Sequence, residues 1–392
     1  MKTRLLSAVL AMSLLLSACS QAAPSSSVSA SNSGKPSTSS SSEKAKEEST
    51  SSQPEPVAKL EIPIEPEWVI KPEYEAMVNY NDGYTVAANE NILYVIDKTG
   101  TIKTTLDYTK LPEQYSVGSI ISATDPVRVS LYAGGMIRIR IGEVTVFFID
   151  KDGNKVLTLY EPSTDPDIVK TSAYATECGI FNDKYTWKVT CPDWNEETLM
   201  YIDKTGKTAF LNPPGHIVRV DSYAEGLALQ QVVTDNGTHL RYIDLDGKVA
   251  LDFPNYQDGG RFKNGYAWVV SATGEGLIDK TGKVIIEPIY GSIGDASTDN
   301  LVSFTPKGSE LTGIMDLTGK VVVEPKFKVL YSPYEGLSYA SEDGVTYGYI
   351  NTKGEYVITP RFTIAYASTD GMLVVKDAKT QKFGAIKNPL QP

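Results

Sequence analysis

One short motif recurs through most of the chain, and it constrains the fold more than any other feature of the sequence. Two apolar residues are followed by Asp, two variable residues and Gly, most clearly at 277–282 (Leu-Ile-Asp-Lys-Thr-Gly). In the other copies the Asp or its replacement is Asp97, Asp150, Asp203, Asp244, Asp316, Asn351 and Lys387. Successive copies stand 35 to 53 residues apart, which is typical of a chain that repeats one supersecondary unit.

Each copy is predicted to be a β-hairpin. The Asp side chain can accept a hydrogen bond from the backbone two residues on, and the Gly permits the left-handed conformation that closes the turn. A β-branched segment leaves the turn and reaches a proline, which marks a strand end or a sheet edge because it lacks an N–H. We expect the aromatic residue two positions after each proline to form a core layer between units. These pairs are Pro254 and Tyr256, Pro288 and Tyr290, Pro325 and Phe327, and Pro360 and Phe362.

A glycine-led segment precedes each hairpin, as in 225–228 (Glu-Gly-Leu-Ala) and 264–267 (Asn-Gly-Tyr-Ala). Together with a short segment after the proline, this makes four strands per unit. The combination resembles the WG-repeat family of bacterial proteins, most clearly in residues 215–392. Tyr347-Gly348 and Phe383-Gly384 stand where the family has Trp-Gly, and the first copies are longer than the rest. The family carries no established activity to transfer.

The two ends of the array look complementary. The last copy, at 383–387, has no outgoing strand, whereas 68–74 (Trp-Val-Ile-Lys-Pro-Glu-Tyr) resembles an outgoing strand without a hairpin. Strands from both ends complete one blade in many β-propellers, which leaves no bare edge. We therefore predict an all-β fold, a β-propeller of seven or eight blades closed by N- and C-terminal strands. The alternative is an open β-hairpin solenoid with ragged ends.

The N-terminus has the features of an export signal. Lys2 and Arg4 precede an apolar segment, 5–16, that is too short to span a bilayer. Residues 16–19 (Leu-Ser-Ala-Cys) resemble the lipobox of bacterial lipoproteins. The resemblance implies a signal peptide at 1–18, cleavage before Cys19, attachment of a diacylglycerol to its thiol and acylation of the new N-terminus, with palmitate as an expected chain. The alternative is an ordinary signal peptide.

The segment after Cys19 has the composition of a disordered linker. Ser occupies 15 of the 37 positions from 20 to 56, and no aromatic residue occurs among them. Such a segment cannot bury enough apolar surface to offset its chain entropy. We therefore predict three parts: the signal peptide (1–18), a lipid-anchored Ser-rich tether (19–56) and one β-repeat domain (57–392). The anchor would hold the protein on the extracytoplasmic face of a bacterial cell membrane.

Residues that support catalysis or metal binding are scarce. The two histidines, His216 and His239, lie in no metal-ligand spacing. Cys178 and Cys191 flank a predicted hairpin and form a possible disulfide outside the cytoplasm, with free thiols as the alternative. No catalytic residues, metal ligands or cofactor site can be assigned from the sequence. We therefore expect a protein without enzymatic activity, cofactor or metal.

Charge and aromatic content narrow the choice of partner. The chain carries 37 Lys and Arg against 48 Asp and Glu, a net charge of −11, which argues against nucleic acid. Tyr is frequent, with 23 copies, and Tyr or Trp can stack on sugar rings or anchor a protein partner. The sequence favours a non-catalytic binding or scaffolding protein that presents one face, or the channel mouth, to an unknown envelope protein or glycan. The alternative is a carbohydrate-active or other hydrolytic propeller with acids in a central funnel.

Overall fold

The structure is a computed structural model that describes residues 63–107, 110, 130–141, 144–159, 177–189, 199–213 and 215–391. These all lie in one compact unit, Lys59–Pro392. The predicted signal peptide, the tether, Cys19 and Cys191 fall outside the described residues. The described part is all-β, as predicted, and it contains no α-helix. In particular, none of these residues belongs to a helix that could cross a membrane.

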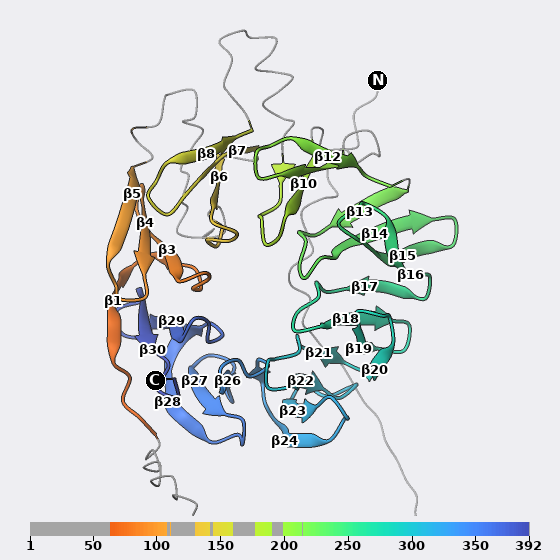
Figure 1. Ribbon diagram of the computed structural model, residues 1–392. Coiled ribbons are helices and arrows are strands. Elements are labelled where there is room, and N and C mark those ends of the chain that lie inside the picture. The colour runs from red at the N-terminus through yellow and green to blue at the C-terminus, as the bar shows by residue number, and fades with distance from the viewer. Residues whose placement is uncertain are drawn as a thin grey trace, which may run out of the picture. The chain divides into compact units, whose positions relative to one another are not determined.

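The strands of the first half of the repeat region form small antiparallel sheets (Figure 1). They are β2 (Ala76–Met77), β3 (Tyr84–Asn89), β4 (Ile92–Asp97) and β5 (Ile102–Asp107) in blade 1; β6 (Ile137–Ile141), β7 (Val144–Ile149) and β8 (Lys155–Thr158) in blade 2; β9 (Glu177–Cys178), β10 (Tyr185–Val189), β11 (Leu199–Asp203) and β12 (Thr208–Leu211) in blade 3; and β13 (His216–Val220), β14 (Ala228–Thr234), β15 (Gly237–Ile243) and β16 (Val249–Phe253) in blade 4.

The second half continues the pattern through two further small sheets and one seven-stranded sheet. The strands are β17 (Tyr256–Gly259), β18 (Tyr266–Ser271), β19 (Glu275–Asp279) and β20 (Val284–Tyr290) in blade 5; β21 (Ser292–Ile293), β22 (Leu301–Thr305), β23 (Thr312–Asp316) and β24 (Val321–Phe327) in blade 6; and β25 (Val329–Leu330), β26 (Leu337–Ser341), β27 (Tyr347–Asn351), β28 (Tyr356–Ala365), β29 (Met372–Asp377), β30 (Phe383–Lys387) and β1 (Trp68–Tyr74) in the larger sheet.

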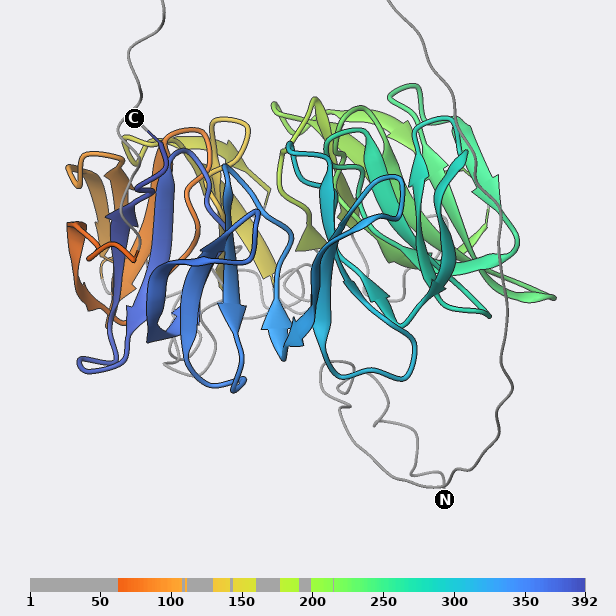
Figure 2. The same ribbon diagram turned by 90° about the horizontal axis from the view of Figure 1, so that it is seen from below.

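The seven-stranded sheet consists of two blades that share one long strand. The first part of β28 pairs with β27, with Tyr356 opposite Ile350, and so forms the outer strand of blade 7. Its last residues pair with β29, with Ala365 opposite Val375, and form the inner strand of blade 8. The described strands therefore group into eight blades arranged around a centre (Figures 1 and 2).

The ends of the chain close this ring. Strand β1 pairs antiparallel with β30, with Ile70 opposite Ala385 and Tyr74 opposite Phe383. It supplies the outer strand that the last repeat lacks, as the sequence predicted. The prediction of a propeller closed by N- and C-terminal strands is therefore confirmed. The open-solenoid alternative is wrong, because its ends would not pair.

The repeated turn has the predicted chemistry. In blade 5 the Asp279 Oδ1 atom accepts hydrogen bonds from the backbone N–H groups of Thr281, at 2.8 Å, and Lys283, at 3.1 Å. Gly282 follows with a φ of 84°. Asn351 makes the same pair of contacts in blade 7. The side-chain oxygen thus replaces backbone acceptors that the tight turn cannot supply.

Pro254 follows the last residue of its strand, β16, as one of the two expectations has it, but the other three prolines do not end their strands. Strands β20, β24 and β28 run through Pro288, Pro325 and Pro360. In each case the pairing with the neighbouring strand shifts register near the proline. Since β20 and β24 are the outermost strands of their sheets, the missing N–H falls at an edge, where a proline and a bulge are tolerated.

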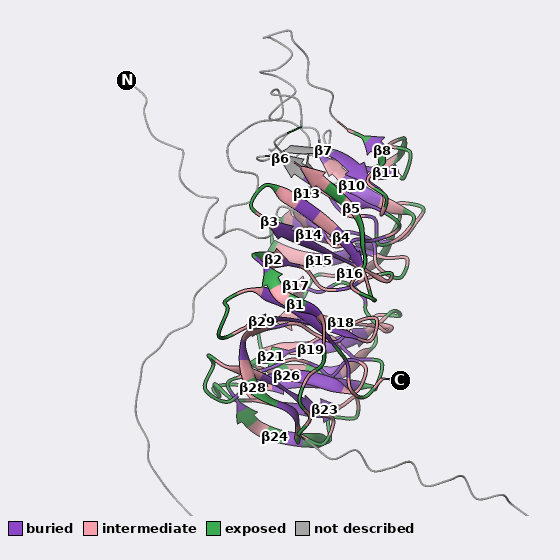
Figure 3. Ribbon diagram, turned by 90° about the vertical axis from the view of Figure 1, so that its left-hand side faces the viewer, coloured by how far each residue is buried: buried purple, intermediate pink, exposed green. Residues whose placement is uncertain are grey.

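The apolar core lies between blades rather than at one centre. The described part of the chain contains eight buried apolar clusters, and each joins two neighbouring blades. Phe327 belongs to the cluster between blades 6 and 7, and Phe362 to the one between blades 7 and 8. These two residues confirm the predicted aromatic layer. Burial follows the same scheme, since β15 is mostly buried and β24 mostly exposed (Figure 3).

Candidate functional site: the channel mouth

Two-residue turns between the first and second strands of the blades meet at one end of the ring. We call them the mouth turns, and each has two successive residues with positive φ, as at Glu225 (53°) and Gly226 (85°). This geometry suits a two-residue β-hairpin and requires glycine or a residue that tolerates the left-handed region. The described mouth turns of this type are 82–83, 134–135, 225–226, 264–265, 335–336 and 370–371.

Carboxylates in the mouth turns connect neighbouring blades. The Gly226 N–H donates to Asp183 Oδ2 of blade 3, at 2.9 Å, while Glu225 Oε2 accepts from the Gly265 N–H of blade 5, at 3.0 Å. We call this arrangement the carboxylate clasp. Three further clasps join Asp82 to Gly134, Glu335 to Gly371 and Asp370 to Gly83. The acids that precede or accompany the repeated glycines therefore fix the mouth turns relative to one another.

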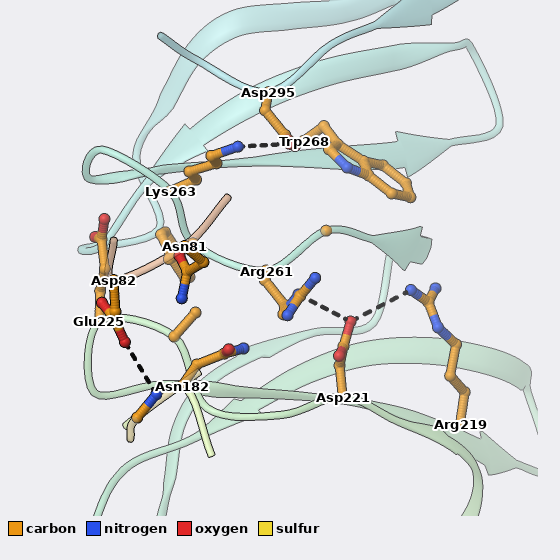
Figure 4. Close-up of a pocket in the computed structure, with 14 residues that line it drawn as sticks. Asn81, Asp82, Asn182, Arg219, Asp221, Glu225, Arg261, Lys263, Trp268 and Asp295 are labelled. Atoms are coloured by element: carbon orange, nitrogen blue, oxygen red, sulfur yellow. Dashed lines mark hydrogen bonds and ion pairs between the residues drawn. The ribbon is translucent and has the colours of Figure 1, made fainter. Parts of the chain in front are cut away.

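A cavity of about 590 Å³ lies among these turns (Figure 4). We call it the mouth cavity. Its lining comes from the first six blades, with Asn81 of blade 1 and Asp295 of blade 6 at the two ends of the series. Ten of the side chains are labelled in Figure 4, and nearly all of them are polar or charged. A cavity of this volume is within the range of small-molecule sites.

Blades 4 and 5 contribute a chain of opposite charges to the mouth cavity. Asp221 Oδ2 lies 3.9 Å from Arg219 Nη2 and 3.4 Å from Arg261 Nε. The other carboxylate oxygen of Asp221 accepts a hydrogen bond from the Ser222 N–H, at 2.8 Å. Arg219 is held from behind by Asp258, which accepts from its Nη1 atom. Asp221 therefore lies between two guanidinium groups that are both partly exposed (Figure 4).

A second ion pair forms the other side of the mouth cavity. Lys263 Nζ lies 3.8 Å from Asp295 Oδ2 and 4.1 Å from the centre of the Tyr334 ring. Burial by surrounding protein lowers the pKa of Lys263, although Asp295 opposes this effect. Asp295 also accepts a hydrogen bond from the Tyr331 hydroxyl, at 3.2 Å. The lysine is thus oriented by an aromatic ring and one carboxylate.

One tryptophan borders the mouth cavity. Trp268, on β18, packs its indole against the backbone of Gly260, where a Cβ would lie only 2.2 Å from the indole Nε1 atom. A side chain at position 260 would displace the ring, so glycine is required here for close packing. Trp268 and Arg261 both line the mouth cavity.

A second cavity of about 360 Å³ shares Asp221 and Arg261 with the mouth cavity. Its lining includes Trp187 and Val220 together with Arg138, whose Nη1 donates to the carbonyl of Cys178. The shared residues place the two cavities side by side. A ligand too long for the mouth cavity could therefore extend past Arg261 into the second cavity.

The residues predicted from the sequence do not form this site. Cys178 is buried at the end of β9, and its carbonyl contacts the lining of the smaller cavity. Cys19 and Cys191 lie outside the described residues, so lipidation and the disulfide stay predictions. His239 pairs with Asp252 at 3.1 Å on blade 4. Among the described residues, no group of three or more acidic, His or Cys side chains could hold a metal ion.

Sequence reasoning missed the charged residues of the mouth cavity. Arg219, Arg261 and Lys263 resemble ordinary surface charges when each repeat is read alone. Their position within the repeat could have identified them, because all three stand shortly before a mouth turn. Residues at that place in successive repeats converge when the array closes into a ring.

The fold and the cavity together define the chain as a β-propeller-type repeat protein with a polar, ligand-sized site at the channel mouth. The model for the WG containing repeat matches the chain at residues 65–91, 241–271, 276–303, 313–345 and 347–378. The chain is therefore a WG-repeat protein, as the motif resemblance indicated. No curated protein matches the chain.

Several solved structures are similar to the chain at low identity. The WD40 domain of Pan2 from Neurospora crassa is 8% identical with a TM-score of 0.39, and the match covers 81% of this chain and 90% of that one. The WD40 domain of SCAP from fission yeast is 12% identical with a TM-score of 0.37, covering 81% and 88%. The dihydro-heme d1 dehydrogenase NirN is 13% identical with a TM-score of 0.41, covering 86% and 77%. Such low scores support no statement about ligand or activity.

Proposed function

We propose that this protein is a lipid-anchored binding protein of the bacterial cell envelope, and that its ligand occupies the mouth cavity without being chemically changed. The observation that carries the proposal is the cavity itself. Residues from six blades converge on a volume of about 590 Å³. Such a concave site with a few convergent polar groups is the usual form of a ligand site.

The state of the carboxylates favours binding over hydrolysis. Glycoside hydrolysis needs two carboxyl groups that face the scissile bond and are available as acid, base or nucleophile. In the mouth cavity Asp221 faces two arginines, Glu225 accepts from Gly265 and Lys280, and Asp295 accepts from Tyr331. These contacts use the acids to hold positive groups and turns in place.

A thermal-shift screen tests the binding role. The full chain in detergent would be screened against neutral sugars, uronates, amino acids and short peptides, because a ligand that binds only the folded state raises Tm. We expect a compound that stabilises the native chain but not Lys263→Ala or Trp268→Ala. Lys248→Ala is the matched control, since Lys248 is an exposed lysine on the outer turn of blade 4. Shifts that are equal in all four proteins would refute a role for the cavity.

The anchor is tested separately in cells. Labelling with a palmitate analogue should occur in the native chain and vanish in Cys19→Ala, because the thiol is the expected attachment site. Inhibition of lipoprotein signal processing should leave the native chain uncleaved. Labelling that persists in Cys19→Ala would show that the lipid, if any, is attached elsewhere.

A further inference from the structure

Three ion pairs of the mouth cavity are longer than direct charged hydrogen bonds. The three contacts among Arg219, Asp221, Arg261, Lys263 and Asp295 span 3.4 to 3.9 Å. On the outer turns, Lys103–Asp97 is shorter, at 2.9 Å, whereas Lys248–Asp246 is equally long, at 3.9 Å. Since direct charged hydrogen bonds measure about 2.7–2.9 Å, Arg261 and Lys263 keep hydrogen-bonding capacity for another partner, whereas Arg219 is already held by Asp258.

Among the cations that line the mouth cavity, Arg261 has the most hydrogen-bond donors without a partner in the described part of the chain. Within the described part of the chain its guanidinium contacts one acid, Asp221, and only through Nε. Both terminal nitrogens, Nη1 and Nη2, therefore remain available at a side chain that is 43% exposed. Two parallel N–H donors on one guanidinium match the two oxygens of a carboxylate.

Two of the four acids that line the cavity, Asp221 and Glu225, have less capacity to spare. Asp221 accepts from Ser222 and faces both arginines. Glu225 is occupied by Gly265 and by Lys280, at 3.1 Å. A cationic ligand at Asp221 or Glu225 would have to displace these contacts, whereas an anionic group could add to the donors already facing the cavity. The chain's net charge of −11 does not oppose this, because one directed contact at short range dominates over distant, screened charges.

The rest of the lining suits a sugar better than a peptide. Trp268 lines the same cavity as Arg261, although part of its ring packs against the apolar cluster between blades 5 and 6. Asn81 and Asn182 add planar groups that donate and accept, and the Asn81 Nδ2 atom already donates to the Tyr132 carbonyl at 2.8 Å. Hydroxyl groups of a sugar need donors and acceptors together, and the aliphatic face of the ring packs on an aromatic side chain. An extended peptide would instead be expected to pair with an exposed strand edge, and the cavity lining comes largely from turns and side chains.

From these contacts we infer that the mouth cavity binds an acidic saccharide, a uronate-bearing glycan whose carboxylate lies on Arg261 and whose ring packs on Trp268. This inference rests on the proposed binding function and specifies its ligand class. Lys263, two residues along the same segment, also lines the cavity and contributes a second positive group. The smaller cavity, which Arg261 also lines, provides space for the next sugar.

Calorimetry with matched sugars tests the ligand class. Cellobiouronate and cellobiose differ only by a carboxylate in place of a hydroxymethyl group, and both would be titrated into the full chain in detergent. We expect cellobiouronate to bind at least about tenfold more tightly, as is typical of a charge-assisted contact. Arg261→Gln should remove this preference. Arg361→Gln is the control, because Arg361 has similar exposure and pairs with Glu65 away from the cavity.

Three results would overturn the inference. These are equal affinity for the two sugars, an acetyl-dialanine carboxylate that binds as tightly as cellobiouronate, or no uronate binding up to about 10 mM, which is weaker than any specific site would give. The first two outcomes would refute the uronate but would still show a binding site, for a ligand of another class. The third, combined with a Trp268-dependent ligand in the thermal-shift screen, would refute the uronate and leave the proposed binding function intact.

Discussion

Gly384 on the last strand lies directly against the carbonyl oxygen of Ile70 on the first strand. A Cβ at position 384 would stand 2.5 Å from that oxygen, closer than real contacts allow. The same relationship recurs within single repeats, between Gly348 and Ile358 and between Gly276 and Ile286. Strand β1 therefore packs on blade 8 in the same way as an outer strand that follows its hairpin directly in the chain. The glycine of each aromatic-Gly pair is required for close approach of the outer strand.

The first prediction concerns Gly384→Ala. The added methyl should push β1 away from β30 and cost roughly 1–3 kcal/mol, as overpacking usually does. Gly348→Ala places the same clash within one continuous stretch of chain, on blade 7. Hydrogen exchange should then show faster exchange of the β1 amides in Gly384→Ala but not in Gly348→Ala. Equal protection of β1 in the two variants would contradict a role for Gly384 in ring closure.

The second prediction concerns the repeated turn. The Thr318 hydroxyl and the backbone N–H groups of Lys320 and Thr318 donate to Asp316 and lower its pKa. Asp316→Ala should lower Tm, because the turn loses these acceptor contacts. Asp316→Asn should retain most of the stability, since Asn351 fills the same role in blade 7. A loss with Asn as large as with Ala would mean that charge, not hydrogen bonding, holds the turn.

The same turn predicts a dependence on pH. A carboxyl group whose pKa is lowered on folding stabilises the fold above its unfolded pKa, about 3.9, and loses that contribution as the pH falls through the folded value. Native Tm should therefore decrease below about pH 4, and the decrease should be smaller in Asp316→Asn, because that variant has one group fewer to protonate. Parallel Tm curves for the two proteins between pH 5 and pH 2 would exclude a contribution from Asp316.

The third prediction concerns Asp221, which competes with a ligand for Arg261. Asp221→Asn should bind cellobiouronate about threefold to tenfold more tightly, because a carboxylate that repels the ligand is removed and the guanidinium is released. Its effect on stability should be small, about 0–1 kcal/mol, since these pairs are partly exposed. Asp246→Asn is the control for net charge, because Asp246 is exposed on the outer turn of blade 4. Weaker uronate binding in Asp221→Asn would contradict the assignment of Arg261.

The hairpins and the closure of the ring were predictable because their determinants are local. Asp279 and Gly282 fix a turn through contacts four residues apart or fewer. The sequence similarity between 68–74 and the outgoing strand 284–290 can be seen directly. It requires only that an outgoing strand be recognised before the first hairpin instead of after one. Closure then follows, since an unpaired outer strand and an unpaired hairpin supply what each other lacks.

The mouth cavity was not predictable in the same way. Arg219, Arg261 and Asp295 lie on three different blades, and their distances depend on the angle between blades rather than on sequence spacing. Gly260 gives no local sign of its role, because the indole that excludes a side chain there belongs to the following strand. The side chains that form a site in a ring of blades can be identified only once the number of blades and the positions of the mouth turns are known.

The last prediction concerns the clasp at the seam between blades 8 and 1. Asp370 Oδ2 accepts the Gly83 N–H at 2.8 Å and joins the two ends of the array at a second place, apart from the pairing of β1 with β30. Asp370→Ala should cost about 1 kcal/mol, the usual net value of one hydrogen bond. Asp370→Asn should cost less, because its side-chain oxygen still accepts. Combining Asp370→Ala with Gly384→Ala should destabilise by more than the sum of the single changes, since in each single variant the remaining contact still holds the seam. Strictly additive losses in urea unfolding would show that the clasp and β1 close the ring independently.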